Sequence, residues 1–113
     1  MALSSRNPLF HAVPAEHARA VRLIGEIDLS TVDDLRAMLD ALSEDGHAVA
    51  LDLAEVTFMD SSGMHAFEAY AQTLNGSRPL VLENAPAHVH RLFELTGGDK
   101  NPNIELRSGD RRG

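Results

Sequence analysis

The chain has 113 residues, of which 43% are hydrophobic and 4% aromatic, and it carries a formal net charge of −7 at pH 7 with no cysteine. This length fits one domain with a single core, and the hydrophobic share is that of a globular protein. The net negative charge and the lack of any Lys/Arg-rich block argue against nucleic acid or an anionic membrane as a partner. The lack of cysteine excludes disulfides, zinc–thiolate sites and thiol catalysis.

The sequence predicts neither a membrane segment nor a secretion signal. No stretch approaches the roughly 18 apolar residues that a transmembrane helix needs. The first ten residues, MALSSRNPLF, lack the apolar core of a signal peptide. We therefore expect a cytoplasmic protein with no membrane partner.

The chain begins with a predicted strand pair. LFHAV at 9–13 has the composition of a short strand, and RAVRLIGEI at 19–27 alternates apolar and polar residues as a half-buried strand does. PAEHA between them predicts a turn. The two segments together predict an N-terminal β-hairpin.

Residues 28–47 predict the first helix, because apolar side chains recur on one face at helical spacing. Ser30 or Thr31 is a suitable N-cap residue, and Gly46 is a natural end. The predicted inner face consists of Val32, Leu35, Leu39 and Leu42.

The middle of the chain predicts a buried strand followed by a second helix. HAVALDLAEVTF at 47–58 is a short, largely apolar run, typical of a central strand with parallel neighbours. After MDSSG, apolar residues again recur at helical spacing until NGS ends the pattern, and they are Phe67, Tyr70, Ala71 and Leu74.

The last third of the chain predicts a strand, a helix and a final strand. PLVLEN at 79–84 has the pattern of another buried strand. APAHVHRLFELTGG at 85–98 predicts a helix that ends at Gly97 or Gly98, and NIELR at 103–107 predicts a weak last strand.

The predicted order is therefore β-β-α-β-α-β-α-β, which indicates an α/β fold with parallel pairing in much of one sheet. With the hairpin, this becomes a mixed sheet of four to five strands with about three helices. We expect one domain at 9–107, with a flexible N-terminus at 1–8 and a flexible C-terminus at 108–113.

The stretch FMDSSGMHAF at 58–67 is the candidate functional segment, because it lies where a predicted strand turns into a helix. In open α/β sheets, function tends to lie at such carboxyl ends. Asp and Ser are also preferred helix N-caps, so a purely structural cap remains an equal alternative from the residues alone.

Catalytic and metal-binding interpretations fit poorly. A nucleophile elbow needs glycine two residues before the serine, and these positions hold Met59 and Asp60. His65 has no evident partner for general-base catalysis. His88 and His90 are two residues apart on a predicted helix, so they do not form the i, i+4 pair of a metal site, and we expect them to be solvated. No P-loop is present. We expect no enzymatic activity, no metal and no cofactor.

Three segments resemble one known family. LIGEIDLSTVDDL at 23–35 is similar to the G-E-[LI]-D segment of STAS domains, and VALDLAEVTFMDSSGM at 49–64 to their central strand and D-S-[ST]-G turn. LVLENAPAHVHRLFELTGGD at 80–99 resembles their last strand and helix with its L-x-L-T-G ending. The three segments occur in the family's order and spacing.

Within that family, a free-standing domain with D-S-S-G most resembles an anti-sigma factor antagonist. This resemblance implies a partner that is an anti-sigma factor with serine kinase activity, which phosphorylates Ser62 and thereby ends binding, and a serine phosphatase that reverses the change. Around Ser62, the residues implied at the partner surface are Glu26, Asp28, Asp60, Ser61, Gly63 and Met64.

Two residues after the D-S-S-G turn depart from the family's pattern. Met64 and His65 stand where the family commonly has leucine and a small residue, which bears on recognition by the kinase. The alternative is a STAS accessory subunit of an ABC-type lipid transport system, in which Ser62 is never phosphorylated.

Overall fold

The structure, a computed structural model, describes residues 9–14, 20–44, 50–74 and 79–108. Its elements follow the predicted order, with a short 3₁₀ helix in addition. They are the strands β1 (Phe10–Pro14), β2 (Ala20–Ile27), β3 (Ala50–Met59), β4 (Leu80–Ala85) and β5 (Ile104–Ser108), the helices α1 (Val32–Glu44), α2 (Ser61–Thr73) and α3 (Ala87–Thr96), and the 3₁₀ helix η1 (Gly98–Lys100).

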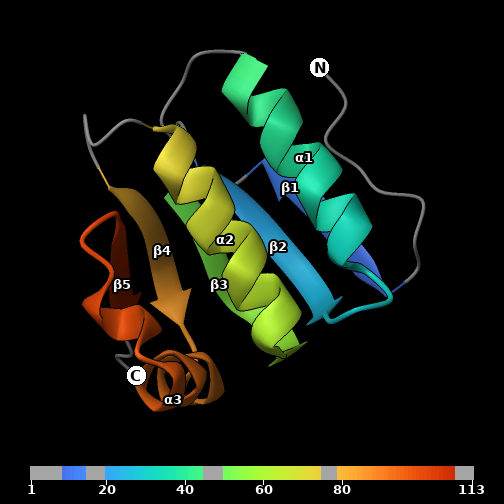
Figure 1. Ribbon diagram of the computed structural model, residues 1–113. Helices are drawn as coiled ribbons and strands as arrows, with labels where there is room; N and C mark the ends of the chain where they lie inside the picture. Colours follow the sequence, from blue (N-terminus) through green and yellow to red (C-terminus); the bar gives the residue numbers. More distant parts are fainter. Residues whose placement is uncertain (1–8, 15–19, 45–49, 75–78, 109–113) are drawn as a thin grey trace.

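The strands form one mixed five-stranded sheet in the order β1-β2-β3-β4-β5 (Figure 1). β1 and β2 are antiparallel, and the other neighbours are parallel. The predicted hairpin and the predicted parallel pairing are both confirmed. Because parallel strands run in the same direction, the carboxyl ends of β2 and β3 lie side by side, and α1 and α2 start there.

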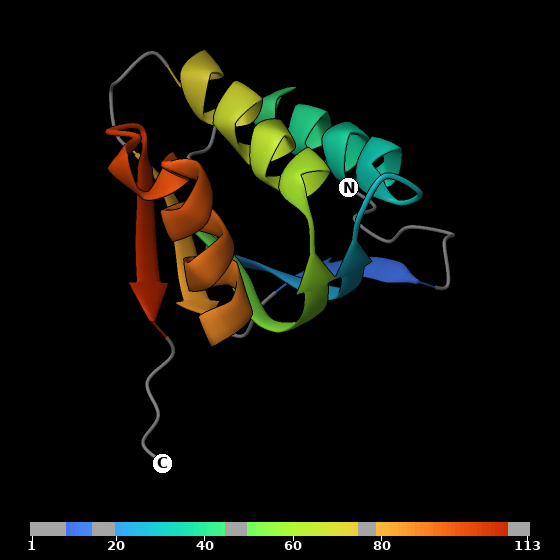
Figure 2. The same ribbon diagram turned by 60° about the horizontal axis from the view of Figure 1, so that its bottom comes forward.

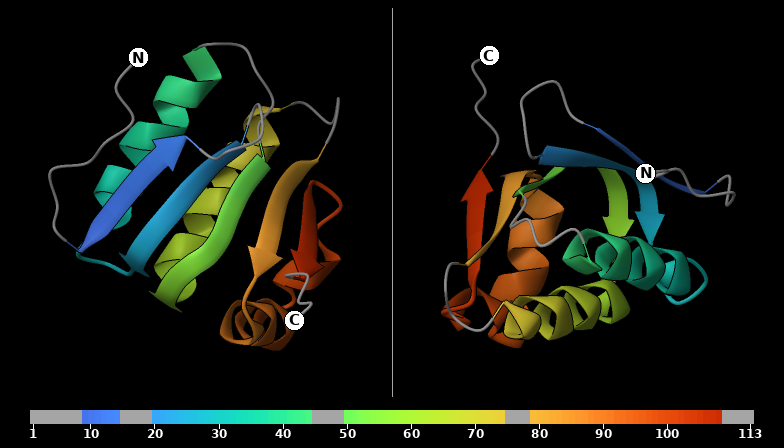
Figure 3. Two further views of the ribbon diagram at one scale, coloured as in Figure 1. Left: turned by 180° about the vertical axis from the view of Figure 1, so that it is seen from behind. Right: turned by 90° about the horizontal axis from the view of Figure 1, so that it is seen from above.

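The helices lie on one side of the sheet, with α1 and α2 next to each other and α3 near β4 (Figures 2 and 3). The core fills the space between the two layers and is mostly aliphatic, as the low aromatic content requires. All four residues of the predicted inner face of α1 are buried. None of the described helices has the length and apolarity needed to cross a membrane.

The opposite face of the sheet has no helix over it (Figure 3, left). Its side chains pair charges across neighbouring strands. Arg22 of β2 forms ion pairs with Asp52 and Glu55 of β3, and Arg107 of β5 pairs with Glu83 and with a second glutamate on its own strand. This face is therefore suited to contact with water over the middle of the sheet.

β3 and β4 pair only over 50–52 and 81–83 and then diverge. Beyond that point His88 of α3 lies beside β3, with its Nε2 3.0 Å from the carbonyl oxygen of Val56. A carbonyl can only accept, so this nitrogen donates. The Nε2 of His90 lies 3.3 Å from the hydroxyl oxygen of Ser108. His88 is exposed and His90 is half-buried. Their exposure agrees with the expectation of solvated side chains, and each imidazole also has one hydrogen-bond partner within the protein.

The ends of several elements differ from the predicted ones by a few residues. Gly97 ends α3 as expected, with a left-handed φ of 82°. Ser108, predicted to begin the flexible C-terminus, is the last residue of β5. The predicted flexible segments at 1–8 and 109–113, and the predicted helix end at Gly46, lie outside the described residues.

Candidate functional site

Two turns with the same hydrogen-bond pattern lie at the carboxyl ends of β2 and β3. In the second turn, Oδ1 of Asp60 accepts from the backbone N–H of Ser62 at 2.9 Å and from its hydroxyl at 2.5 Å. In the first turn, Oδ1 of Asp28 accepts from the backbone N–H of Ser30 at 2.9 Å and from its hydroxyl at 2.7 Å. The backbone N–H of Asp60 donates to the carbonyl of Ile27 at 3.1 Å, which holds the two turns next to each other.

The N-cap of α2 is Asp60, and the two serines are the first two residues of the helix. The carbonyl of Asp60 also accepts from the backbone N–H groups of Gly63 and Met64. The helix start therefore does not depend on a serine as its cap. Ser61 is exposed and Ser62 is half-buried, so the hydroxyl of Ser62 remains available for chemistry while Asp60 fixes its position.

Gly63 lies where the first turn of α2 packs against β2. A Cβ at this position would lie 2.5 Å from Cγ2 of Ile27, a distance that needs the neighbouring side chain to shift. Glycine thus allows the helix to approach the strand. Because Gly63 is buried, its predicted role as a direct partner contact is corrected to one of packing.

Met64 is also in the core, with only 3% of its surface exposed. Its sulfur lies 2.8 Å from the Thr96 hydroxyl, and a Cβ on Gly98 would come within 3.0 Å of the sulfur. The expectation that Met64 offers an apolar surface to a partner is therefore wrong for this conformation. The helical period explains it, because Met64 and Phe67 share the inner face of α2, while His65 is exposed.

The loop between β2 and α1 is fixed by Thr31, whose side chain is buried. Its hydroxyl donates to the carbonyl of Glu26 at 2.8 Å and accepts from the backbone N–H of Asp28 at 3.0 Å. Thr31 thus ties the loop back onto β2. Glu26 and Asp28 are both half-buried and lie at the same end of the sheet as Ser62.

The electrostatics of Asp28 follow from this loop. The hydrogen bond from the Ser30 hydroxyl lowers the pKa of the Asp28 carboxyl below its ordinary value. Partial desolvation raises this pKa, and the backbone N–H donors of Ser30 and Thr31 lower it further. A carboxyl with a lowered pKa is ionised at neutral pH. Asp28 therefore presents a fixed negative charge beside the Asp60 turn.

Sequence reasoning did not identify the apolar side chains at this end. Leu29 is 79% exposed and Phe58 is 47% exposed. A strict alternation after the buried Val56 would have turned Phe58 inward. The only sequence signal for Leu29 is an aliphatic residue in a polar loop.

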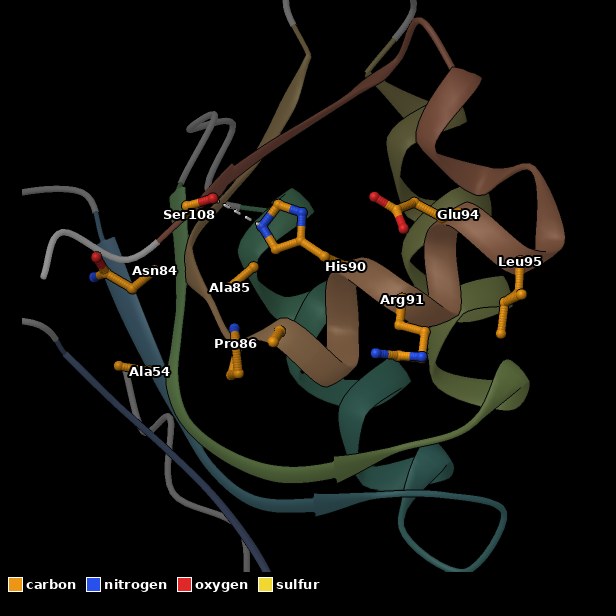
Figure 4. Close-up of a pocket in the computed structure, with 10 residues that line it drawn as sticks. Ala54, Asn84, Ala85, Pro86, His90, Arg91, Glu94, Leu95 and Ser108 are labelled. Carbon is orange, nitrogen blue, oxygen red and sulfur yellow. Dashed lines mark hydrogen bonds between the residues drawn. The ribbon is translucent and has the colours of Figure 1, made fainter.

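A separate hollow of about 880 Å³ lies beside α3 and contains none of the predicted site residues (Figure 4). It is shallow and open, and it is bordered by the outer face of α3 and by the ends of β4 and β5. In Figure 4 His90 and Ser108 face each other at its rim. Within the described part of the chain, no group of three or more His, Asp or Glu side chains is arranged to hold a metal ion.

The comparison with protein families decides the assignment, since the STAS domain model matches residues 11–110. This chain belongs to the STAS domain family. Over 79 residues, it is 34% identical to the anti-sigma-B factor antagonist of Staphylococcus epidermidis, covering 68% of this chain and 73% of the relative. The protein of the same name from Staphylococcus aureus strain COL is 33% identical over the same shares.

Two solved structures share the fold of this STAS domain. The crystal structure of an anti-sigma factor antagonist from Mycobacterium paratuberculosis superposes with a TM-score of 0.74 at 24% identity, covering 91% of this chain and 90% of that one. The Bacillus cell fate determinant SpoIIAA, in its phosphorylated form, gives a TM-score of 0.60 at 18% identity, covering 91% and 92%. The mixed sheet and helices described above are thus those of a STAS domain.

Proposed function

We propose that this STAS domain is an anti-sigma factor antagonist, a regulatory cytoplasmic protein rather than an enzyme. In this function it binds an anti-sigma factor and so releases a sigma factor for transcription. Phosphorylation of Ser62 by the same anti-sigma factor, acting as a serine kinase, ends binding, and a serine phosphatase restores it. The observation that carries the proposal is the Ser62 hydroxyl, held by Asp60 at the start of α2, in a chain whose curated relatives are named anti-sigma-B factor antagonist.

The position of Ser62 suits phosphoryl transfer from a partner. Its hydroxyl lies at an N-terminal helix turn and is partly accessible, and Asp60 orients it. In the reaction, the Oγ–P bond forms, the bond between the β- and γ-phosphates of ATP breaks, ADP leaves and the hydroxyl proton is released. All ATP-binding machinery comes from the kinase, because this chain has no P-loop.

Phosphorylation would change the charge of the turn without removing its cap. The phosphate adds about −1.5 to −2 charges at pH 7. The hydroxyl donor to Asp60 is lost, and the phosphate is repelled by that carboxylate. The backbone N–H of Ser62 still donates to Asp60, so α2 keeps its cap. Asp60 already accepts a hydrogen bond from the backbone N–H of Ser62, so the attraction that α2 offers the phosphate comes from the positive end of its helix dipole.

The partner contact is where the phosphate should have its effect. Asp60 and Ser61 adjoin Ser62, and Glu26 and Asp28 lie at the same end of the sheet, in two segments, 24–34 and 56–65, that contain no Lys or Arg. A desolvated dianion here would add to the negative charge of Glu26, Asp28 and Asp60. Mismatching one charge in a buried contact costs roughly 2–5 kcal/mol. This corresponds to a loss of affinity of about 30-fold to several thousand-fold, since about 1.4 kcal/mol is tenfold.

Titration calorimetry tests the proposal with the purified ATP-binding anti-sigma factors encoded in the same genome. The unmodified domain and Ser62→Ala should bind one of them, and the phosphorylated domain should bind it far more weakly. Ser62→Asp should imitate phosphorylation only in part, because a carboxylate carries less charge and fewer acceptor oxygens. Equal affinities for the phosphorylated and unmodified domain, or a phosphate mapped to Ser61 alone, would contradict the proposal.

The other function considered, an accessory subunit of an ABC-type lipid transport system, predicts a different set of neighbours. Genes for ABC subunits beside this one would favour it, whereas a gene for an ATP-binding serine kinase would favour the anti-sigma antagonist. The names of the curated relatives support the latter.

A further inference from the structure

We propose that Phe58 and Leu29 are the apolar anchors of the partner surface, and that they fit an apolar pocket bordered by Lys or Arg on the anti-sigma factor. The inference rests on the proposed function, and it names the side chains that hold the partner. Neither residue follows from the D-S-S-G turn. Both result from the way in which β2 and β3 end.

A β-bulge turns Phe58 to the surface. In the pairing of β2 with β3, Gly25 lies opposite Val56, but the next residue, Glu26, lies opposite Phe58. Thr57 is therefore an extra residue in β3, and the alternation shifts by one. As a result, Thr57 and Phe58 are both exposed between the buried Val56 and Met59. Bulges of this kind re-aim side chains next to functional sites.

The exposure of Phe58 is unusual for this chain. The chain has four phenylalanines and one tyrosine. Phe58 is 47% exposed, whereas Phe10, Phe67 and Phe93 are 0% exposed and Tyr70 is 5% exposed. A chain with few aromatic residues thus exposes one of them just before the Asp60 turn, and large aromatic side chains are among those that contribute most to protein–protein binding.

Two more exposed leucines lie at this end of the sheet, Leu9 across from Glu26 and Leu29 in the loop after β2. The backbone N–H of Glu26 donates to the carbonyl of Leu9 at 2.8 Å, and Glu26 is the register partner of Phe58. Leu9, Glu26 and Phe58 therefore form a row across the end of the sheet. Leu29, at 79% exposure, follows Asp28 in the adjoining loop.

The charges around these anchors indicate the chemistry of the occupant. Segments 24–34 and 56–65 contain no Lys or Arg, and their carboxylates are Glu26, Asp28, Asp33, Asp34 and Asp60. On the middle of the open sheet face, by contrast, acidic side chains are paired with Arg22 and Arg107. An apolar centre whose bordering segments carry carboxylates and no Lys or Arg is complementary to a protein surface with an apolar pocket and a basic rim.

Phosphorylation of Ser62 then acts next to these anchors. Apolar side chains supply affinity only when water is removed from around them. Ser62 follows Phe58 by four residues, just past the end of β3, so we infer that a dianion on Ser62 retains water near the same end of the sheet. Phe58 and Leu29 therefore supply the binding free energy that phosphorylation of Ser62 reduces.

The experiment compares two leucines that are equally exposed but lie on different parts of the surface. Leu29 and Leu95 are both 79% exposed, and Leu95 lies on α3, away from the two Asp turns. The affinities of the unmodified domain and of Leu29→Ala, Phe58→Ala, Phe58→Leu and Leu95→Ala are measured against the anti-sigma kinase, with melting curves for each. We expect about 30-fold weaker binding for Phe58→Ala and about tenfold for Leu29→Ala, as for side chains that carry much of an interface. Leu95→Ala should bind within about twofold of the unmodified domain, and Phe58→Leu should recover part of the loss.

The outcomes separate this inference from the proposed function. If the unmodified domain binds none of the purified anti-sigma kinases, the proposed function is overturned and the anchors with it. If the unmodified domain binds and releases on phosphorylation, but Phe58→Ala and Leu29→Ala bind as tightly as Leu95→Ala, the anchors are wrong and the proposed function stands. If Phe58→Ala binds more weakly but also melts well below the unmodified domain, Leu29→Ala decides, because its side chain is 79% exposed and its removal should leave the fold intact. Undiminished binding by that variant would also count against the pair.

Discussion

At the scale of single residues, the two side chains of the D-S-S-G turn divide the roles that the sequence left open. Asp60 accepts both the backbone N–H and the hydroxyl of Ser62, so it is the cap and also the residue that orients the hydroxyl. The side chain of Ser62 takes part in only one of these two hydrogen bonds, the one from its hydroxyl. The structural and the functional interpretation of the turn therefore belong to different residues.

This division predicts an order of stabilities. Asp60→Ala should lower the free energy of unfolding by about 0.5–2 kcal/mol, because α2 loses its cap. Ser62→Ala should cost less, since Asp60 still accepts the backbone N–H. Urea unfolding of the two variants and the unmodified domain measures the difference. A Ser62→Ala domain less stable than Asp60→Ala would show that the hydroxyl holds the helix start.

The matching turn at Asp28 makes a prediction about pH. The pKa of the Asp28 carboxyl is lowered first by the Ser30 hydroxyl, so Ser30→Ala should move this pKa up toward its ordinary value of about 3.9. Because the pKa is lowered in the folded state, the stability that Asp28 contributes is fully present when the pH is above the ordinary pKa of the carboxyl. This stability is lost as the pH falls through the lowered pKa of the folded protein. NMR titration of the Asp28 carboxyl in both proteins tests this. An unchanged pKa in Ser30→Ala would contradict it.

At the scale of elements, close backbone approaches at glycine join the strands and helices of the site. Gly25 has a φ of +112°, and a Cβ there would lie 2.1 Å from the carbonyl oxygen of Leu9. This approach allows the hydrogen bond from Glu26 to Leu9, at the end of the β1–β2 hairpin. The glycine of the G-E-I-D segment is thus required by the hairpin rather than by the partner.

Three alanine substitutions separate steric clash from backbone strain. Gly25→Ala should destabilise the domain by about 2–4 kcal/mol, because the clash is with backbone and φ is positive. Gly97 also has a positive φ, but a Cβ there would meet no atom within 4 Å, so Gly97→Ala should cost only about 1 kcal/mol. Gly63→Ala should fall between them, since the neighbouring Ile27 side chain can shift. Chemical denaturation measures all three, and equal losses for Gly25→Ala and Gly97→Ala would show that φ alone decides the cost.

At the scale of the whole molecule, the net charge of −7 and the acidic end of the sheet act on association. The association rate constant with a basic partner should fall by about tenfold between roughly 50 mM and 500 mM NaCl, because salt screens long-range attraction. The dissociation rate constant should change little with salt, and Phe58→Ala should instead raise it. Stopped-flow or surface-plasmon measurements separate the two constants. An association rate that does not depend on salt would rule out electrostatic steering.

The sequence by itself determined the order of the elements, the mixed sheet, the inner face of α1 and the placement of the D-S-S-G turn at a helix start. These follow from apolar periodicity, turn residues and capping chemistry, which act over a few neighbouring residues. The resemblance to STAS domains added the family, which the match over residues 11–110 confirms. Such local rules operate before any distant contact exists, so they can be read along the chain.

Only the tertiary structure decided which residues of the site face a partner. Met64 and Gly63 were predicted at the surface, but packing of α2 against Ile27, Thr96 and Gly98 buries them. Phe58 ends the segment predicted to be a buried central strand, but an extra residue in the register with β2 turns it outward. Each of these outcomes depends on an element more than 30 residues away in sequence or on the register of a neighbouring strand. The residue pattern of one segment does not contain that information, because whether a side chain is buried depends on the element that packs against it.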